Sequence, residues 1–146
     1  MSATNQHSLR IPSAKRYLGD VRTFVEAYAH QAGFAEHEVE HIKLAADEAC
    51  TNIIEHAYQN QDQNAIELVI SIQEQTFSIL LRHRGKPFDA MLYHRPQDLR
   101  ASLNARKGGG WGVFLMNRLM DEVAYRSENG TNEVLLTKRR NTPSHE

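Results

Sequence analysis

Two polar residues, Glu48 and Asn52, lie one helical turn apart in a segment whose apolar residues recur at helical spacing. Residues four apart on a helix project from one face. A carboxylate beside an amide suits activation of a hydroxyl and ligation of Mg²⁺ through hard oxygen atoms. The neighbours Ala45 and Ala49 leave room for a ligand. The alternative is an ordinary solvated helix surface, and the pair alone does not exclude it.

A glycine-rich segment, Gly108-Gly109-Gly110-Trp111-Gly112, precedes a helical pattern over Val113–Met120. Glycines let a backbone approach an anion closely, and the N–H groups and positive dipole end of the following helix favour phosphate. The segment lacks the Gly-Lys-Ser/Thr of a Walker-type loop, and no strand of a parallel unit leads into it. A phosphate-binding segment and a flexible turn both stay open.

His83 lies at the end of an alternating segment and shares the parity of Phe77, Ile79 and Leu81. Alternate residues of a strand face the same side, so we expect this imidazole to point toward the core. A satisfied, partly buried histidine is the ordinary interpretation.

Two helices and a sheet are needed to position these residues. Apolar spacing predicts one helix from a Ser13 cap to about Ala32, closed by Gly33, and a second over about Glu36–Tyr58. Alternation predicts strands near residues 9–11, 66–73, 77–81, 123–125 and 134–136, the last four forming two hairpins. Residues 85–107 are expected to form a loop with a helical turn near 97–103. The expected fold is α+β: a two-layer sandwich whose mixed, mostly antiparallel sheet packs against about three helices.

Composition limits the function classes. The 146 residues predict a single domain over 1–146, with its core at about 9–138 between short polar ends. With 17 Lys and Arg against 18 Asp and Glu, no direct nucleic-acid binding is expected. The lone Cys50 fits a reducing compartment, and neither a signal peptide nor a membrane-length apolar run is visible, so we expect a cytoplasmic protein without membrane contact.

The three chemical segments resemble, in order, the boxes of one family. Asp47-Glu48-Ala49-Cys50-Thr51-Asn52-Ile53-Ile54-Glu55-His56-Ala57-Tyr58 resembles the N-box of the anti-sigma-factor serine/threonine-protein kinases, which belong to the histidine-kinase-like ATPases (GHKL, Bergerat fold). Gly85 with Pro87-Phe88-Asp89 resembles the G1 box, and Gly108-x-Gly110-x-Gly112-Val113-Phe114-Leu115 the G2 box. Leu119-Met120-Asp121-Glu122-Val123 and Asn129-Gly130-Thr131 extend the likeness, which covers about residues 9–138.

The resemblance implies ATP and Mg²⁺ as cofactors and a role for each matching residue. Glu48 would be the catalytic base and Asn52 the Mg²⁺ ligand. Gly85 would leave space at the adenine, and Thr131 would help to hold a water there. The triphosphate would be wrapped by Gly108, Gly110 and Gly112. Residues 90–107 would be the ATP lid, whose Arg95, Arg100, Arg106 and Lys107 would meet phosphates; a solvated basic loop is the alternative for each.

The resemblance also implies partners. The protein would phosphorylate a STAS-type anti-sigma-factor antagonist and sequester a sigma factor, the two activities of partner switching. A homodimer is expected, with sigma-factor contacts through the first helix and its surroundings. Arg16, Arg22 and Glu26 are exposed candidates for these contacts, and a solvated face is the alternative.

One position departs from the family pattern. His83 stands where the family has an aspartate that accepts a hydrogen bond from the adenine amino group. A neutral imidazole has one acceptor nitrogen and an imidazolium none. Loss of such a contact costs about 1.5–3 kcal/mol. The alternative is therefore a non-enzymatic pseudo-kinase, a binding switch with weakened or lost ATP binding. The ATP-binding half of a sensor histidine kinase ranks lower, because it needs a preceding helical hairpin with the phospho-accepting histidine.

Overall fold

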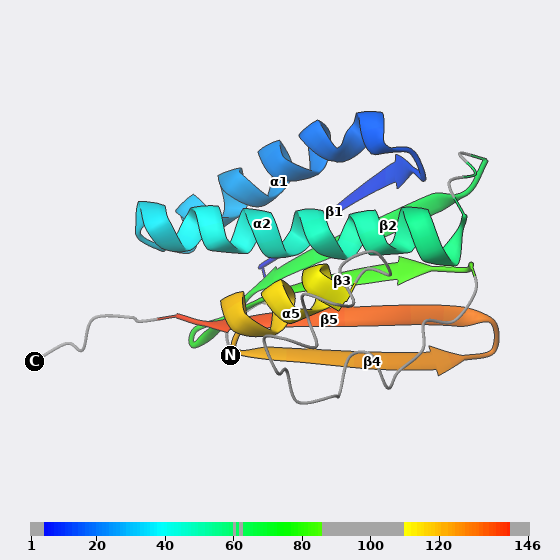
Figure 1. Ribbon diagram of the computed structural model, residues 1–146. Coiled ribbons are helices and arrows are strands. Elements are labelled where there is room, and N and C mark those ends of the chain that lie inside the picture. Colours follow the sequence, from blue (N-terminus) through cyan, green and yellow to red (C-terminus); the bar gives the residue numbers. More distant parts are fainter. Residues whose placement is uncertain (1–4, 60, 62, 86–109, 141–146) are drawn as a thin grey trace, which may run out of the picture.

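The computed structural model describes residues 5–59, 61, 63–85 and 110–140. They form two layers, a five-stranded sheet and a layer of helices that covers one of its faces (Figure 1). The strand order is β1-β2-β3-β5-β4, and every neighbouring pair is antiparallel. The α+β sandwich is therefore confirmed, with an antiparallel sheet in place of a mixed one.

Each of the five predicted strands is present; four are longer than predicted, and β2 has its predicted length but begins one residue earlier. They are β1 (Asn5–Pro12), β2 (Ala65–Ile72), β3 (Thr76–His83), β4 (Glu122–Glu128) and β5 (Thr131–Arg139). Both predicted hairpins, β2–β3 and β4–β5, are present. The second hairpin joins the sheet through β5, which pairs with β3 and sets His83 opposite Asn132. The end of β3 therefore meets the turn of the β4–β5 hairpin.

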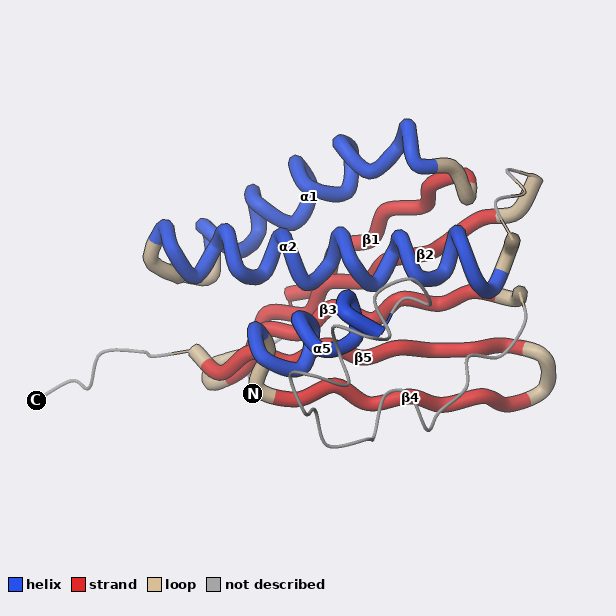
Figure 2. The backbone as a smooth tube through the Cα atoms, viewed as in Figure 1, coloured by secondary structure: helices blue, strands red, loops and turns tan. Residues whose placement is uncertain are grey.

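The helical layer contains α1 (Leu18–Gln31), α2 (Glu36–Asn52) and α5 (Gly110–Leu119) (Figure 2). The predicted Ser13 cap is wrong: a 3₁₀ turn, η1 (Lys15–Tyr17), precedes α1, and the buried Ser13 hydroxyl donates to the carbonyl oxygen of Gln61. Gly33 closes α1 as expected, with φ of +93°, a value that disfavours any residue with a Cβ.

The core lies between α2 and the sheet. Its largest fully buried side chains come from every layer and include Val21, Ile42, Ile53, Ile54, Ile66, Leu68, Ile70, Phe77, Ile79, Leu81, Met116 and Leu136. Alternation along β2 and β3 puts one set of side chains in this core and the other on the opposite, uncovered face. No helix among the described residues is long and apolar enough to cross a membrane.

Candidate functional site

Glu48 and Asn52 occupy the last two turns of α2, which leads toward the end of the sheet where β3 finishes (Figure 1). Asn52 is only 3% exposed, and Glu48 is half-buried. This burial rejects the solvated-surface alternative for the pair. Within the described residues the Asn52 Nδ2 atom is buried and has no hydrogen-bond partner. An unpaired buried polar group costs about 1–3 kcal/mol, and the described residues supply no partner that offsets this cost for the Asn52 amide.

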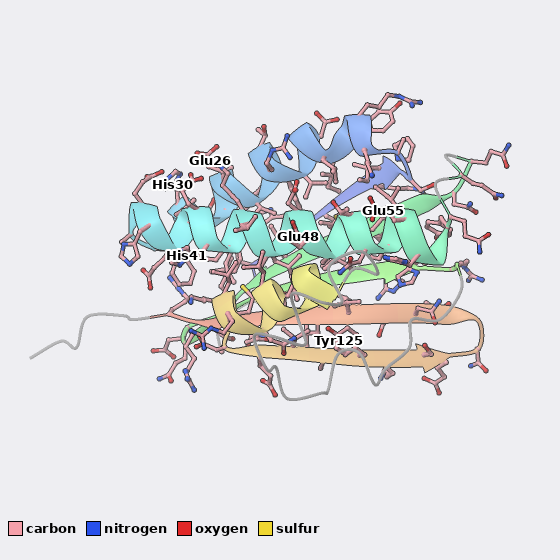
Figure 3. All side chains as sticks on the ribbon, viewed as in Figure 1. Glu26, His30, His41, Glu48, Glu55 and Tyr125 are labelled. Carbon is pink, nitrogen blue, oxygen red and sulfur yellow. The ribbon has the colours of Figure 1, made fainter. Side chains whose placement is uncertain are left out.

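The surroundings of Glu48 favour the protonated form of its carboxyl group. Burial raises its pKa above the usual value, and the nearby carboxylates of Asp47 and Glu55 raise it further. A raised pKa brings a carboxylate closer to the pH at which it exchanges protons efficiently. Figure 3 shows Glu48 and Glu55 along the same stretch of α2 and its continuation.

A π-helical turn, η2 (Ile53–Ala57), follows Asn52 where the sequence predicts ordinary helix. The Tyr58 N–H donates to the Ile53 carbonyl oxygen over 3.0 Å, five residues back, which widens the last turn. The Tyr58 hydroxyl then donates to the Ala65 carbonyl oxygen at 2.9 Å and accepts from the Arg84 N–H at 2.8 Å. These two hydrogen bonds connect Tyr58, which follows η2, to the first residue of β2 and to the residue after β3.

Gly85 is required by that close approach. A Cβ at this position would lie 2.5 Å from the Ala57 carbonyl oxygen and 2.7 Å from Tyr58 Cδ1. The Gly85 carbonyl oxygen accepts a hydrogen bond of 2.8 Å from Asn132 Nδ2, and Asn132 Oδ1 accepts one of 2.6 Å from the Ser127 hydroxyl. This chain of contacts joins η2, β3, β5 and β4 at one end of the sandwich.

His83 is buried at this end, with 3% of its surface exposed, as its parity predicts. It is not a satisfied core histidine, because its Nδ1 atom is buried without a hydrogen-bond partner among the described residues. The ring meets Tyr58 edge-on, with centroids 6.0 Å apart. Burial lowers the pKa of His83 to about 4, so the imidazole is neutral at physiological pH.

A hollow of about 170 Å³ opens beside His83. Its lining consists of His83, Tyr125, Arg126, Ser127, Asn132, Glu133 and Val134. By strand register, His83, Asn132 and Ser127 form one row across β3, β5 and β4. The polar row on the core-facing side predicts a binding pocket rather than further hydrophobic packing.

α5 begins at Gly110, three residues before the predicted Val113, so Gly110 and Gly112 lie in its first turn. Leu119, its last residue, leads directly into β4, and α5 therefore runs antiparallel to β4 with its positive N-terminal end directed toward the end that carries the hollow (Figure 1). A helix N-terminus directed in this way favours the binding of a phosphate group. The predicted Gly108, Arg106, Lys107, Arg95 and Arg100, the loop with its turn near 97–103 and Pro87-Phe88-Asp89 lie outside the described residues.

His83, Gly85 and Thr131 lie where β3 ends and β5 begins, Thr131 being the half-buried first residue of β5. Asn52 is the last residue of α2, which leads toward the same end of the sheet (Figure 1). Sequence reasoning missed Tyr58, Ser127 and Asn132 as parts of the site. Asn132 carried a signal, because it is a polar residue that shares the core-facing parity of Val134 and Leu136. Tyr58 and Ser127 carried none, since their contacts depend on the π turn and on strand register.

The predicted sigma-factor candidates, Arg22 and Glu26 on α1 and Arg16 in the preceding η1, make contacts within the chain. Arg22 Nη1 lies 2.6 Å from Asp47 Oδ1, and Glu26 pairs with Lys43 at 3.5 Å. The Arg16 guanidinium lies over the Tyr17 ring, 5.0 Å from its centroid. The two ion pairs join α1 to α2, and Figure 3 shows Glu26 in this seam.

Known proteins resemble this chain over most of its length. Residues 11–138 match the family described as "Histidine kinase-like ATPase domain". The "Serine-protein kinase RsbW" of Bacillus cereus is 32% identical over 133 residues, covering 89% of this chain and 82% of that protein. Its namesake in Bacillus velezensis is 30% identical over 135 residues, with the same coverage. The crystal structure of the RsbU and RsbW domains of a Mycobacterium tuberculosis protein matches 92% of this chain at a TM-score of 0.65 and 15% identity, and this chain spans 32% of that longer one.

Proposed function

The chain belongs to the histidine kinase-like ATPases and to the family of the RsbW serine-protein kinases, and from this premise we propose that Glu48 and Asn52 form the centre of its kinase site. The protein is an ATP-dependent serine-protein kinase and anti-sigma factor. The pseudo-kinase alternative is not favoured, because the relatives that match nearly the whole chain carry the name of a kinase.

The observation that carries the proposal is the paired burial of these two side chains. Glu48 is half-buried with a raised pKa, and one turn later Asn52 buries an amide whose Nδ2 has no partner among the described residues. A merely structural pair on this helix would be either solvated or satisfied. A base and an unfilled polar group on one face of a helix fit the acceptor hydroxyl and a metal-bound phosphate.

The residues of the chain divide the work of phosphoryl transfer. Mg-ATP, when bound, supplies the phosphoryl group and the charge neutralisation that such transfer requires. Glu48 takes the proton of the incoming serine hydroxyl on its carboxylate. Asn52 would hold the Mg²⁺ ion through its amide oxygen. Its Nδ2 group, which is buried without a partner among the described residues, would donate a hydrogen bond to an oxygen of the bound ligand.

The remaining residues place the nucleotide. We assign the base to the hollow lined by His83, with Gly85 and Thr131 near it on the basis of the family resemblance, and the phosphates to the first turn of α5 with Gly110 and Gly112. The positive dipole end of that helix and its unpaired N–H groups favour the negative charge. Gly108, Arg106 and Lys107 extend this proposal to the preceding segment, on the basis of the family resemblance.

The proposed partners follow from the same family. We propose that the substrate is a serine of a STAS-domain anti-sigma-factor antagonist and that the protein sequesters a sigma factor. We further propose that it works as a homodimer in the cytoplasm, as one domain, and without direct contact to nucleic acid. The formal charge of −1 is in keeping with protein partners rather than DNA.

Transfer of ³²P from γ-labelled ATP to a STAS-domain antagonist, with Mg²⁺ present, tests the site. Removal of a general base lowers such rates by about 10²–10⁴-fold, so Glu48→Gln should reduce transfer by that factor. Binding of Mg-ATP, measured by calorimetry, should persist in the variant. The matched control is Glu40→Gln on the exposed part of the same helix, where Glu40 pairs with Lys43 at 3.1 Å. Undiminished transfer by Glu48→Gln removes Glu48 from the role of base.

A further inference from the structure

Polar side chains from three strands line the hollow beside His83. His83 and Val134 line it together with Ser127 and Asn132, whose side chains already hydrogen-bond to each other at 2.6 Å. Asn132 Nδ2 is also engaged, by the Gly85 carbonyl oxygen. Both ends of the Asn132 amide are thus already hydrogen-bonded. In this row, His83 is the side chain with a buried ring nitrogen that has no partner among the described residues.

Among the described residues, no hydrogen bond to Nδ1 fixes the position of the His83 ring proton. The tautomer of a neutral histidine is set by the hydrogen bond that one ring nitrogen makes. Nδ1 is buried and makes none with the described residues, and its aromatic neighbour Tyr58 meets the ring edge-on with its hydroxyl already shared between Arg84 and Ala65. The ring can therefore present either a donor or an acceptor to a bound base.

A protonated ring would present donors only. The low pKa of His83, about 4 because of burial, excludes this form near neutral pH. A carboxylate at the same position would present acceptors only. The neutral, unfixed imidazole differs from both, since it can accept from a 6-amino group or donate to a 6-oxo group.

We propose that His83 makes the nucleotide pocket permissive at purine position 6, so that it takes 6-oxo as well as 6-amino purine nucleoside triphosphates. The inference rests on the proposed function, because it assigns the base to this hollow. It names the substrate class as purine nucleoside triphosphates, with ATP as one member.

Calorimetric titration of the full chain with Mg-ATP and Mg-ITP tests the proposal. ITP differs from ATP only in its 6-oxo group and in the proton on the neighbouring N1 atom. The ratio of the two dissociation constants therefore measures how strongly the pocket discriminates at this edge of the base. We expect a ratio within about tenfold, since each base meets one neutral hydrogen bond. A preference above tenfold for either nucleotide overturns the proposal. Binding of ATP alone overturns it while leaving the kinase assignment intact, and binding of neither contradicts the proposed function as well.

Substitutions at His83 sharpen the result. His83→Asp should favour ATP over ITP by more than tenfold, because the carboxylate repels the 6-oxo group. His83→Asn keeps a neutral donor and acceptor and should keep the ratio within tenfold. His41→Asp, on the exposed side of α2, is the control for a new carboxylate and should not change the ratio. An equal ratio in His83→Asp and the unaltered protein shows that His83 does not read the base, and overturns the proposal.

Discussion

Polar residues on the two faces of the sheet differ in whether they have partners among the described residues. On the face without helices, strand register aligns five charged residues of alternating sign across all strands: Arg10, Glu67, Arg82, Glu133 and Arg126. Arg82 lies at the centre, with Nε 3.0 Å from Glu133 and Nη1 2.8 Å from Glu67, and Arg126 reaches Glu133 at 3.1 Å. The acidic groups of this row meet partners from neighbouring strands.

On the covered face, one residue further along β3, His83 has a buried Nδ1 atom without a partner among the described residues. Asn52 on α2 repeats this arrangement with its Nδ2 atom. Pairing within the chain stabilises, whereas an unpaired buried polar group lowers stability. We propose that the paired residues serve the fold and that the unpaired ones serve a ligand, and each prediction below changes one side of this comparison.

The largest expected effect comes from acidification. Burial lowers the pKa of His83 from 6.5 to about 4, so between these values the unfolded chain binds a proton that the folded chain does not. The free energy of unfolding therefore falls as pH is lowered, by about 2 kcal/mol at pH 5 and at most about 3 kcal/mol. Glu48 acts in the opposite sense, because its raised pKa makes the folded chain retain a proton longer as pH rises.

Urea unfolding of the protein and of His83→Asn between pH 7.5 and 5 measures this effect. The asparagine does not titrate, so the stability difference between the two proteins should change by about 2 kcal/mol over the range. Parallel pH profiles for the two proteins contradict a buried neutral His83.

The next effect concerns the contact between η2 and β3. Gly85→Ala places a Cβ 2.5 Å from the Ala57 carbonyl oxygen, and the backbone must shift. We expect a loss of about 1–3 kcal/mol in stability together with weaker nucleotide binding. Gly19→Ala is the matched control, because its Cβ meets only Arg22 Nη2 at 3.8 Å and alanine favours the helix by about 0.5–1 kcal/mol. Thermal unfolding compares them; equal melting temperatures for both variants disagree with the close approach.

Asn52→Leu removes one of the unpaired groups and keeps the shape of the side chain. Its stability should stay the same or rise slightly, since no hydrogen bond of Nδ2 within the described residues is lost. Affinity for Mg-ATP should fall by about 10–100-fold if the amide holds the metal ion. Calorimetry measures the affinity for ATP with and without Mg²⁺. If Asn52→Leu lowers the affinity by the same factor in both series, Asn52 contacts the nucleotide rather than the metal ion.

Local patterns predicted the elements well, and the site only in part. Alternation predicted the burial of Phe77, Ile79, Leu81 and His83, because it depends on strand geometry alone. The four-residue spacing likewise put Glu48 and Asn52 on one face of α2.

The spacing of residue types does not reveal contacts between residues that are far apart in the sequence. The π turn after Asn52 depends on how Tyr58 reaches Ala65 and Arg84, and the engagement of Asn132 depends on the β3–β5 register. Serine is a common N-cap residue, so the sequence predicts a helix cap at Ser13. In the structure the Ser13 hydroxyl donates instead to the carbonyl oxygen of Gln61, in the loop before β2. The need for Gly85 became visible only with Ala57 beside it.

The smallest effect is expected on the uncovered face. Arg82→Met removes the central charge of the row, whose side chain is 39% exposed, and ion pairs of this exposure contribute at most about 1 kcal/mol. The loss should shrink further at high salt, because screening weakens the pairs in the unaltered protein. Mg-ATP affinity should change by less than about threefold, since Arg82 points to the face of β3 opposite His83 and reaches the hollow only through its partner Glu133. A nucleotide affinity that falls further than this with Arg82→Met would mean that the two faces are coupled through the strand, and that the charged row positions His83 as well as stabilising the sheet.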